Sequence, residues 1–312
     1  MDYVPLGRSG LKVSRVCLGT NMIGDYVDLP ASDRMVSAFL DAGGNFIDTS
    51  NSYSKTRSEE LLGEILRGRK RHDVVLATKV ATQVGQGVHD GGGSRKHILD
   101  SVEQSLKRLK TDYIDLYQMH RWDDATPIEE TMRTLHLLVQ QGKVRYIGCS
   151  NYAAWQICKA MWVSDSLGLE RFVSAQPSYS FLDRAIEREV VPVCKDQEIG
   201  IIPYQVLISG MVSGRYKPGE EPPAGSRMAA RERSRVRAFN ERTYRAVQRV
   251  LDLAKKYAKD PVQLSIAWAL HKPGITSVIA GASKPEQARA NLEATTIRLS
   301  PEEVKELDTV GS

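Results

Sequence analysis

The chain has little that would mark a metal protein, a disulfide-rich secreted protein or a membrane protein. It has only four cysteines, which are Cys17, Cys149, Cys158 and Cys194. They form no C-x-x-C pair and no cysteine–histidine spacing, so we expect reduced core residues and no metal site. The most apolar window, 199–212, is too short to cross a bilayer and is interrupted by Pro203 and Gln205. The first ten residues lack a secretory signal pattern, so we expect a cytoplasmic protein with no membrane segment.

The chain also has no large excess of charge of either sign. The net charge is +5, and no run of five like charges occurs among the 312 residues. The most basic stretch, RMAARERSRVR at 227–237, is interrupted by alanines and a glutamate. This pattern fits a solvated helix face or loop, or a contact with a small anionic ligand. No aromatic residues alternate with the cations, so we expect no nucleic-acid partner.

Short β-branched runs recur along the chain, and helical patterns lie between most of them. The expected strands are centred near residues 16, 46, 76, 115, 147, 174, 201 and 278. Such an alternation predicts an α/β fold, either a doubly wound sheet or a closed (β/α)8 TIM barrel. The count of eight favours the barrel, and so does the lack of G-x-G-x-x-G after the first run. The glycine-rich segment 85–94 has the wrong spacing and place. We therefore predict a single barrel domain over residues 1–312.

In a barrel of this kind the chemistry lies at the carboxyl ends of the strands. The first strands of this chain end on titratable side chains, and the later ones on amides, a hydroxyl and an aromatic ring. The residues at these ends are Gly19, Thr20, Asp48, Tyr53, Lys79, His120, Ser150, Asn151, Gln176, Tyr204 and Gly281 to Lys284. This division predicts proton chemistry on one side and a planar, polar cofactor on the other.

The four titratable residues make a plausible general acid for a carbonyl oxygen. The reference pKa of tyrosine, about 10, is too high for ready proton exchange at neutral pH. A lysine ammonium beside Tyr53 favours the phenolate, which is the role we expect for Lys79, with Asp48 keeping it charged. A neutral His120 can donate a hydrogen bond to the same oxygen. No nucleophile with an adjacent base accompanies them, and hydride from a nicotinamide is the partner that fits.

These segments resemble the aldo-keto reductases over essentially the whole chain, in the branch of bacterial aldo/keto reductases and potassium-channel β subunits. The matching motifs are FIDTSNSY (46–53), LATK (76–79), DLYQMHRWD (115–123), GKVRYIGCSNY (142–152) and SAQPSYS (174–180). The resemblance implies that Tyr53, Lys79, Asp48 and His120 are catalytic. It also implies NADP(H) as cofactor, with Ser150, Asn151 and Gln176 on the nicotinamide carboxamide and Tyr204 stacked on the ring.

The same resemblance assigns the remainder of the cofactor site. VIAGASKPEQARANL (278–292) corresponds to the turn that holds the adenosine end, and a loop at about 205–240 corresponds to the segment that covers the cofactor. The implied contacts are Gly19, Thr20, Gln205, Leu207, Arg215, Arg227, Gly281, Ser283, Lys284, Gln287 and Asn291. Two departures stand out. Gln205 and Val206 replace the Ser-Pro of many relatives, and Gln287 stands where other branches have an arginine.

The expected substrate is a small or medium carbonyl compound, because the candidate pocket walls are aromatic and apolar. The pocket residues we expect are Met22, Tyr26, Trp122 and Tyr179. The function predicted first is NADPH-dependent reduction of aldehydes or ketones. Two alternatives remain, an NAD(P)-dependent sugar or alcohol dehydrogenase in the oxidative direction, and a cofactor-sensing binding subunit with little turnover. We expect a monomer or a homo-oligomer.

Overall fold

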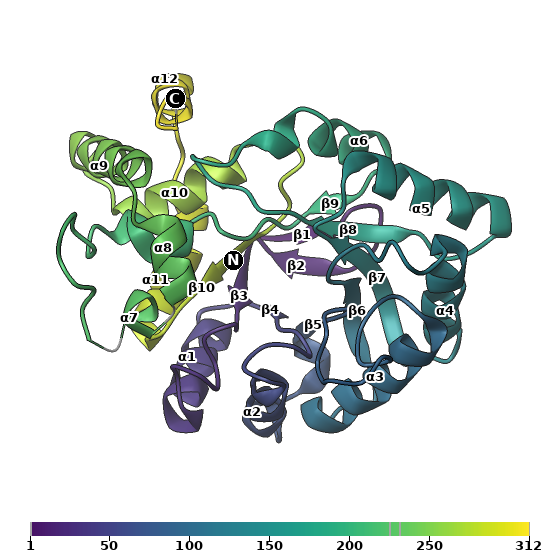
Figure 1. Cartoon of the computed structure of the whole chain (residues 1–312). Helices are drawn as coiled ribbons and strands as arrows, with labels where there is room; N and C mark the ends of the chain where they lie inside the picture. The colour runs from purple at the N-terminus through teal and green to yellow at the C-terminus, as the bar shows by residue number, and fades with distance from the viewer. Residues whose placement is uncertain (1, 225, 231, 312) are drawn as a thin grey trace.

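The computed structural model describes residues 2–224, 226–230 and 232–311 and contains a closed parallel barrel (Figure 1). Its strands are β3 (Val16–Gly19), β4 (Phe46–Asp48), β5 (Val75–Val80), β6 (Ile114–Met119), β7 (Val144–Ser150), β8 (Phe172–Gln176), β9 (Gly200–Ile201) and β10 (Val278–Gly281). They are hydrogen-bonded in the order β10-β3-β4-β5-β6-β7-β8-β9. The amide of Ile279 donates to the carbonyl of Pro203 at 2.9 Å, and this contact joins the two ends of the sheet. The predicted (β/α)8 fold is confirmed.

Helices surround the barrel, and several of them bury an apolar side against the outer face of the strands. They are α1 (Leu29–Asp41), α2 (Arg57–Leu66), α3 (Arg95–Leu109), α4 (Ile128–Gln140), α5 (Ala154–Leu167), α6 (Val190–Asp196), α9 (Glu241–Lys256), α10 (Pro261–Leu270), α11 (Pro285–Glu293) and α12 (Pro301–Asp308). Side chains cap several of their first turns, as where Ser94 accepts from the amide of His97 at 3.3 Å. None of the described helices is long and apolar enough to span a bilayer.

The interior of the barrel changes from apolar to polar along each strand. Phe46, Ala77 and Leu116 belong to the inner apolar cluster. Because side chains on a strand face the same side every second residue, the next inward positions are Asp48, Lys79 and Gln118. At most 1% of the surface of each of these three polar residues is exposed. The strand period thus places a polar layer directly above the apolar one.

An antiparallel hairpin that the sequence analysis did not anticipate closes the amino end of the barrel. It consists of β1 (Tyr3–Pro5) and β2 (Lys12–Ser14), seen near the barrel axis in Figure 1. Leu6 and Val13 are fully buried in the inner apolar cluster. Gly7 has a φ of +55°, and a Cβ there would lie 2.4 Å from the carbonyl oxygen of Val173. Glycine is therefore required where the turn meets the strands.

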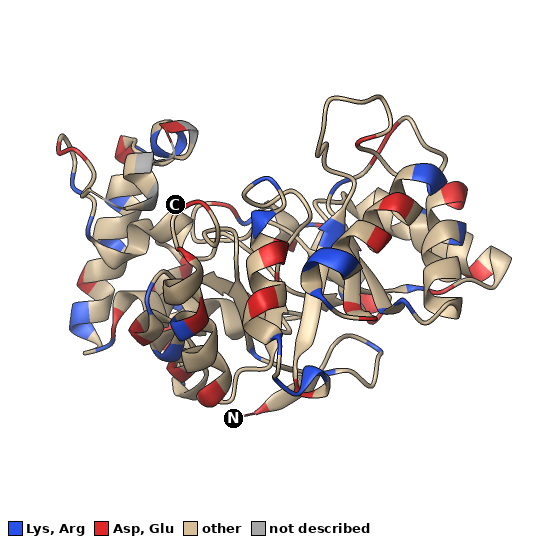
Figure 2. Ribbon diagram, turned by 90° about the horizontal axis from the view of Figure 1, so that it is seen from below, with Lys and Arg blue, Asp and Glu red and all other residues tan. Residues whose placement is uncertain are grey.

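The segment expected to cover the cofactor is partly helical. It contains the 3-10 helix η3 (Ile208–Ser213) and the short helices α7 (Arg227–Ala230) and α8 (Glu232–Ala238). Met211, Tyr216 and Met228 form an apolar cluster of its own. In the basic stretch, Arg235 pairs with Glu221 at 3.4 Å and Val236 is 72% exposed, as expected for a solvated helix face. Figure 2 likewise shows acidic and basic residues interspersed along the helices.

Candidate active site

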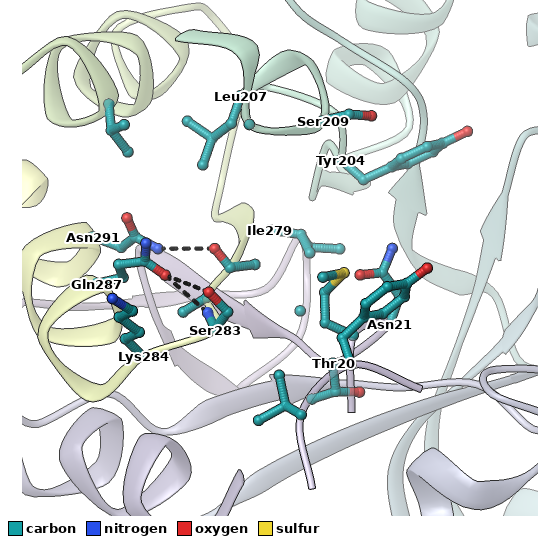
Figure 3. Close-up of a pocket in the computed structure, with 18 of the residues that line it drawn as sticks. Thr20, Asn21, Tyr204, Leu207, Ser209, Ile279, Ser283, Lys284, Gln287 and Asn291 are labelled. Carbon is teal, nitrogen blue, oxygen red and sulfur yellow. Dashed lines mark hydrogen bonds between the residues drawn. The ribbon is translucent and has the colours of Figure 1, made fainter. Parts of the chain in front are cut away.

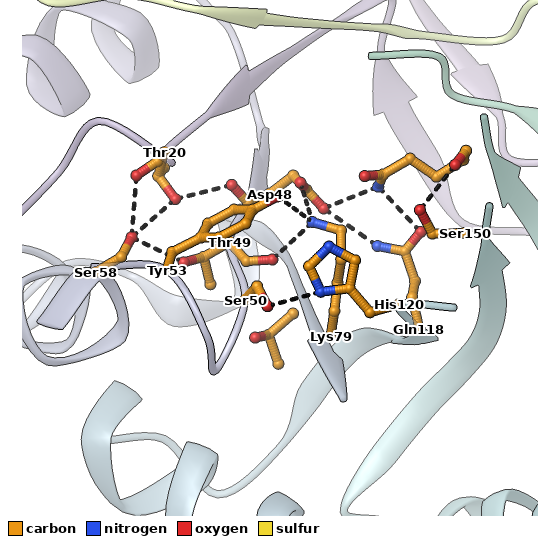
Figure 4. A network of polar contacts seen from close by, with 12 residues as sticks. Thr20, Asp48, Thr49, Ser50, Tyr53, Ser58, Lys79, Gln118, His120 and Ser150 are labelled. Carbon is orange, nitrogen blue, oxygen red and sulfur yellow. Dashed lines mark hydrogen bonds and ion pairs between the residues drawn. The ribbon is translucent and has the colours of Figure 1, made fainter. Parts of the chain in front are cut away.

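Lys79 lies at the centre of a buried polar network at the carboxyl end of the barrel (Figure 4). Its ammonium group donates to Asp48 Oδ1 at 2.5 Å, to the carbonyl of Thr49 at 2.8 Å and to the Tyr53 hydroxyl at 3.2 Å. Burial by itself would lower the pKa of Lys79, but Asp48 and Tyr53 outweigh it and raise that pKa above its usual value. The lysine therefore stays charged, with its three protons directed at three oxygens.

Two glutamines hold the other side of the Asp48 carboxylate. Gln118 Nε2 and Gln176 Nε2 each donate to Asp48 Oδ2 at 3.1 Å. The carboxylate thus accepts from an ammonium on one oxygen and from two amides on the other, which compensates for its burial. Asp48 is fixed from three strands, β5, β6 and β8.

His120 lies beside Tyr53, and the two rings meet edge to face with centroids 5.9 Å apart. Ser50 Oγ lies 3.1 Å from His120 Nδ1. Burial lowers the pKa of His120 to about 3, and the charges of Lys79 and Arg121 act in the same direction. The ring is therefore neutral near pH 7 and able to donate one hydrogen bond, as the proposed role requires.

The loop that carries Tyr53 is held at its base by three buried hydroxyl groups. Ser58 Oγ lies 2.9 Å from Thr49 Oγ1 and 3.1 Å from Thr20 Oγ1, so the first residues of α2 are tied to the ends of β3 and β4. The residues 54–56 between Tyr53 and α2 all have positive φ. Such backbone persists only where the surroundings fix it. The loop is thus rigid at the point where it presents the phenol.

A cavity of about 470 Å³ runs from this network along the rim of the barrel (Figure 3). Asp48, Tyr53 and Gln176 line one end, and Ser283, Lys284 and Gln287 line the other. The predicted cofactor residues along its wall are Gly19, Thr20, Gln176, Tyr204, Gln205, Leu207, Arg215, Gly281, Ser283, Lys284, Gln287 and Asn291. A Cβ at Gly19 would lie 2.8 Å from Ile279 Cγ2, so a larger residue would displace the cavity wall there.

The far end of the cavity is ordered by the first turn of α11. Gln287 Oε1 accepts from the amide and the hydroxyl of Ser283 at 2.9 and 3.1 Å, and Asn291 Nδ2 donates to the carbonyl of Gly281 at 3.4 Å. Lys284 directly precedes Pro285, the first residue of the helix. A cation and a helix amino terminus together suit an anion.

Gln205, which departs from the family pattern, stabilises a strained turn. Its φ is +67°, and those of Ile208, Ser209 and Gly210 are also positive. Gln205 Oε1 accepts from the Ser209 amide at 3.1 Å and from the Ser209 hydroxyl at 3.0 Å. The glutamine therefore shapes the turn beside the cavity. Val206, in the proline position, is fully buried.

Several predicted site residues lie outside the cavity wall. Ser150 Oγ donates to the carbonyl of Gln176 at 2.8 Å, while Asn151 Nδ2 donates to the carbonyl of His120 at 2.9 Å. Tyr204, which does line the cavity, donates from its hydroxyl to Asn151 Oδ1 at 2.8 Å. These residues adjoin the site but bond to one another, and their contacts with a carboxamide remain predictions. The predicted contact of Arg227 involves a side chain outside the described residues.

Two of the expected substrate-pocket residues are placed differently, whereas Met22 and Tyr26 do line the cavity. Trp122 packs edge-on against Tyr152 with ring centroids 5.3 Å apart. Tyr179 is a correction to the prediction: it is 1% exposed, and its ring stacks on Trp268 at 5.2 Å. Gln176 faces inward and Tyr179 lies three positions later in extended backbone, so the strand period of two directs Tyr179 toward the outer layer. The cysteines also differ in part, since Cys158 is exposed on α5.

Gln118, Ser50 and Ser58 were missed by the sequence analysis. Gln118 lies two residues before His120 on β6, so the strand period could have indicated that both face inward. Ser50 lies in the same polar loop as Tyr53, but only the fold brings it to His120. No local signal connects Ser58 with Thr20, which is 38 residues away.

A family model described as the aldo/keto reductase family matches residues 15–312, and the chain belongs to this family. The resemblance inferred from the motifs is confirmed.

Similar curated proteins span nearly the whole chain. A probable voltage-gated potassium channel subunit beta of Oryza sativa subsp. japonica is 36% identical, over 99% of this chain and 96% of that protein. The uncharacterized oxidoreductase YrpG of Bacillus subtilis is 35% identical, with 99% and 96% covered. An NADP+-dependent aryl-alcohol dehydrogenase of Phanerodontia chrysosporium is 36% identical, with 96% and 83% covered. The family and these names support an oxidoreductase with a nicotinamide cofactor.

Proposed function

We propose that this protein is an NADPH-dependent oxidoreductase that reduces aldehydes or ketones to alcohols, with Tyr53 as the general acid. The observation that carries the proposal is the placement of the Tyr53 hydroxyl on the cavity wall, 3.2 Å from the buried ammonium of Lys79. An acid of this kind, held beside a buried ammonium group, suits hydride addition to a carbonyl group.

The donors along the cavity fit a phosphorylated dinucleotide. Gln176 and Tyr204 offer an amide and an aromatic face beside the acid, Arg215 offers a cation on the cavity wall, and Lys284 with the start of α11 offers an anion site at the far end. The proposed contacts are therefore the nicotinamide near Tyr53, the pyrophosphate near Arg215 and the adenosine phosphate near Lys284. Bound there, the nicotinamide would supply the hydride.

The protein's own groups then perform the proton transfer. Tyr53 gives its proton to the carbonyl oxygen as negative charge develops there, and Lys79 stabilises the phenolate that remains. Asp48 keeps the lysine charged and oriented. The neutral His120 donates a hydrogen bond to the same oxygen and aligns the substrate. Met22 and Tyr26 supply apolar and aromatic wall beside the acid.

The test is oxidation of NADPH with a reactive aromatic aldehyde, followed by nicotinamide absorbance and repeated with NADH. We expect many turnovers per site for the wild type, and retained NADPH binding without turnover for Tyr53→Phe. Tight NADPH binding with no turnover across a broad carbonyl panel would instead favour a cofactor-sensing subunit, a role supported by the relatives named as potassium channel subunits. Faster alcohol oxidation would favour the dehydrogenase direction, as in the name of the Phanerodontia relative.

A further inference from the structure

Two fully or nearly buried glutamines meet beneath the cavity, and only one of them lines it. Gln118 on β6 is 0% exposed, and Gln176 at the end of β8 is 3% exposed. Gln176 Nε2 donates to Asp48 Oδ2 at 3.1 Å and to Gln118 Oε1 at 3.2 Å. Gln118 Nε2 donates to Asp48 Oδ2 at 3.1 Å. The two amides and the carboxylate therefore form a closed triangle of hydrogen bonds.

This triangle determines which end of the Gln176 amide faces the cavity. A primary amide nitrogen has two protons, and those of Gln176 are directed at Asp48 and at Gln118. If the amide were turned over, its oxygen would face a carboxylate oxygen and an amide oxygen, and neither of these two contacts would contain a proton. Burial makes such an unpaired arrangement costly, because no water can supply the missing hydrogen bonds. The carbonyl oxygen of Gln176 is thus left for the cavity side.

We propose that Gln118 is a positioning residue that holds Gln176 with its carbonyl oxygen toward the cofactor, where that oxygen accepts from the amide nitrogen of the nicotinamide carboxamide. This inference rests on the proposed function. Gln118 touches neither the cavity nor the reacting atoms, and it acts through Gln176 on the cofactor and through its second contact on Asp48. Gln118 thereby connects Gln176, which would contact the cofactor, with Asp48 of the proton-transfer network.

The proposal is tested by a thermodynamic cycle, in which one residue of the protein and one group of the ligand are changed singly and together and the binding affinities are compared. Gln118→Met keeps the approximate length of the side chain and removes both the donor and the acceptor. NADP+ is compared with its acetylpyridine analogue, in which a methyl group replaces the amide nitrogen, and both affinities are measured by calorimetry without turnover. Tyr117→Phe is the matched control, because its neighbouring position on β6 faces the outer apolar layer.

We expect Gln118→Met to weaken NADP+ binding about fivefold, the worth of one hydrogen bond of about 1 kcal/mol. The analogue cannot donate to Gln176, so we expect it to bind the wild type less tightly and to be unaffected by the substitution. Tyr117→Phe is expected to change neither affinity. Equal weakening of both ligands, or weakening of neither, would refute the positioning role.

The outcomes also separate this inference from the proposed function. If the wild type bound neither nucleotide, the proposed function itself would fail. If it bound NADP+ tightly and the cycle showed no coupling, only the role of Gln118 would fail. Should Gln118→Met not fold, Gln118→Asn retains a polar amide that is one methylene too short for the triangle, and the same coupling is expected.

Discussion

The ammonium group of Lys79 lies 3.2 Å from the hydroxyl oxygen of Tyr53, and no more than 2% of the side chains of Lys79 and its partner Asp48 is exposed. A positive charge this close to a phenol, and this far from solvent, stabilises the phenolate far more than a surface lysine would. The opposite charge of Asp48 prevents the lysine from losing its proton. These three residues thus form one electrostatic unit, in which the removal of any member changes the other two.

Tyr53→Phe removes the proton donor and leaves the ring that lines the cavity. We expect kcat/KM for a reactive aldehyde to fall by about 10²–10⁴, the usual worth of general acid catalysis. The affinity for NADPH, measured by fluorescence titration, is expected to stay within about twofold, far less than one hydrogen bond to a charged group contributes. Comparable activity in the variant would show that another group protonates the substrate.

Asp48→Asn leaves the buried ammonium of Lys79 without its counter-ion. Breaking a buried ion pair costs about 3–5 kcal/mol, so we expect the free energy of unfolding in urea to fall by this amount. The double variant Asp48→Asn, Lys79→Met removes both charges and is expected to be more stable than Asp48→Asn alone. A double variant with additive losses would mean that the two charges do not depend on each other.

The low pKa of His120, about 3 in the folded protein, predicts a pH dependence of stability. Below the ordinary histidine pKa of about 6.5, the imidazole binds a proton in the unfolded chain but stays neutral in the folded chain. The free energy of unfolding therefore falls as the pH falls from about 6.5 toward 3. Each pH unit well inside this window costs about 1.4 kcal/mol. His120→Asn, compared with the wild type by urea unfolding across the window, is expected to show a slope shallower by one proton. Equal slopes would contradict the neutral, buried imidazole.

Tyr117→Phe and Tyr179→Phe form a matched pair of buried tyrosines. The Tyr117 hydroxyl has no hydrogen-bond partner among the described residues, whereas that of Tyr179 donates to Glu187. We expect Tyr117→Phe to stabilise the protein by about 1 kcal/mol, because an unsatisfied buried hydroxyl is removed, and Tyr179→Phe to destabilise it by about the same amount. Thermal unfolding of both variants measures the difference in stability. If both variants lost the same amount of stability, the two hydroxyl groups would not differ in their contribution.

Lys284→Ala tests the proposed coenzyme preference. We expect NADPH affinity to fall about tenfold or more, as for a charged hydrogen bond of about 1.5–3 kcal/mol, while NADH affinity changes little. Lys107, on the last turn of α3, is a suitable control because it does not line the cavity. An equal loss for both coenzymes would place Lys284 away from the adenosine phosphate.

The eight strands and the grouping of the candidate site residues could be predicted from sequence because both depend on local patterns. A short β-branched run that ends on Asp48 or Lys79 can be identified as a strand end from a few neighbouring residues. The side of a helix is harder to assign when both sides are apolar, as on α5, where Ile157 is buried but Trp155 and Trp162 are 58% and 63% exposed. Periodicity cannot choose between such faces, and Cys158 was assigned to the core for this reason.

Long-range contacts set the other limit of prediction. The hairpin that closes the barrel depends on the amide of Arg8 donating to the carbonyl of Glu198 at 2.8 Å. Nothing near Arg8 in sequence indicates this partner. Tyr179 shows the same limit, since its ring partner Trp268 lies on α10 and only the folded chain brings the two together.

The pairing of β10 with β3 makes assembly of the barrel depend on its last strand. The amide of Val278 donates to the carbonyl of Arg15 at 2.9 Å, and Ser277 Oγ donates to the carbonyl of Ser14 at 2.8 Å. During synthesis the ribosome releases β3 early, but its partner strand emerges only after β4 to β9 have been made. Until then β3 has an unpaired edge, the feature through which strands of separate chains associate. Aggregation during expression is therefore expected to depend on how quickly β10 reaches the nascent barrel.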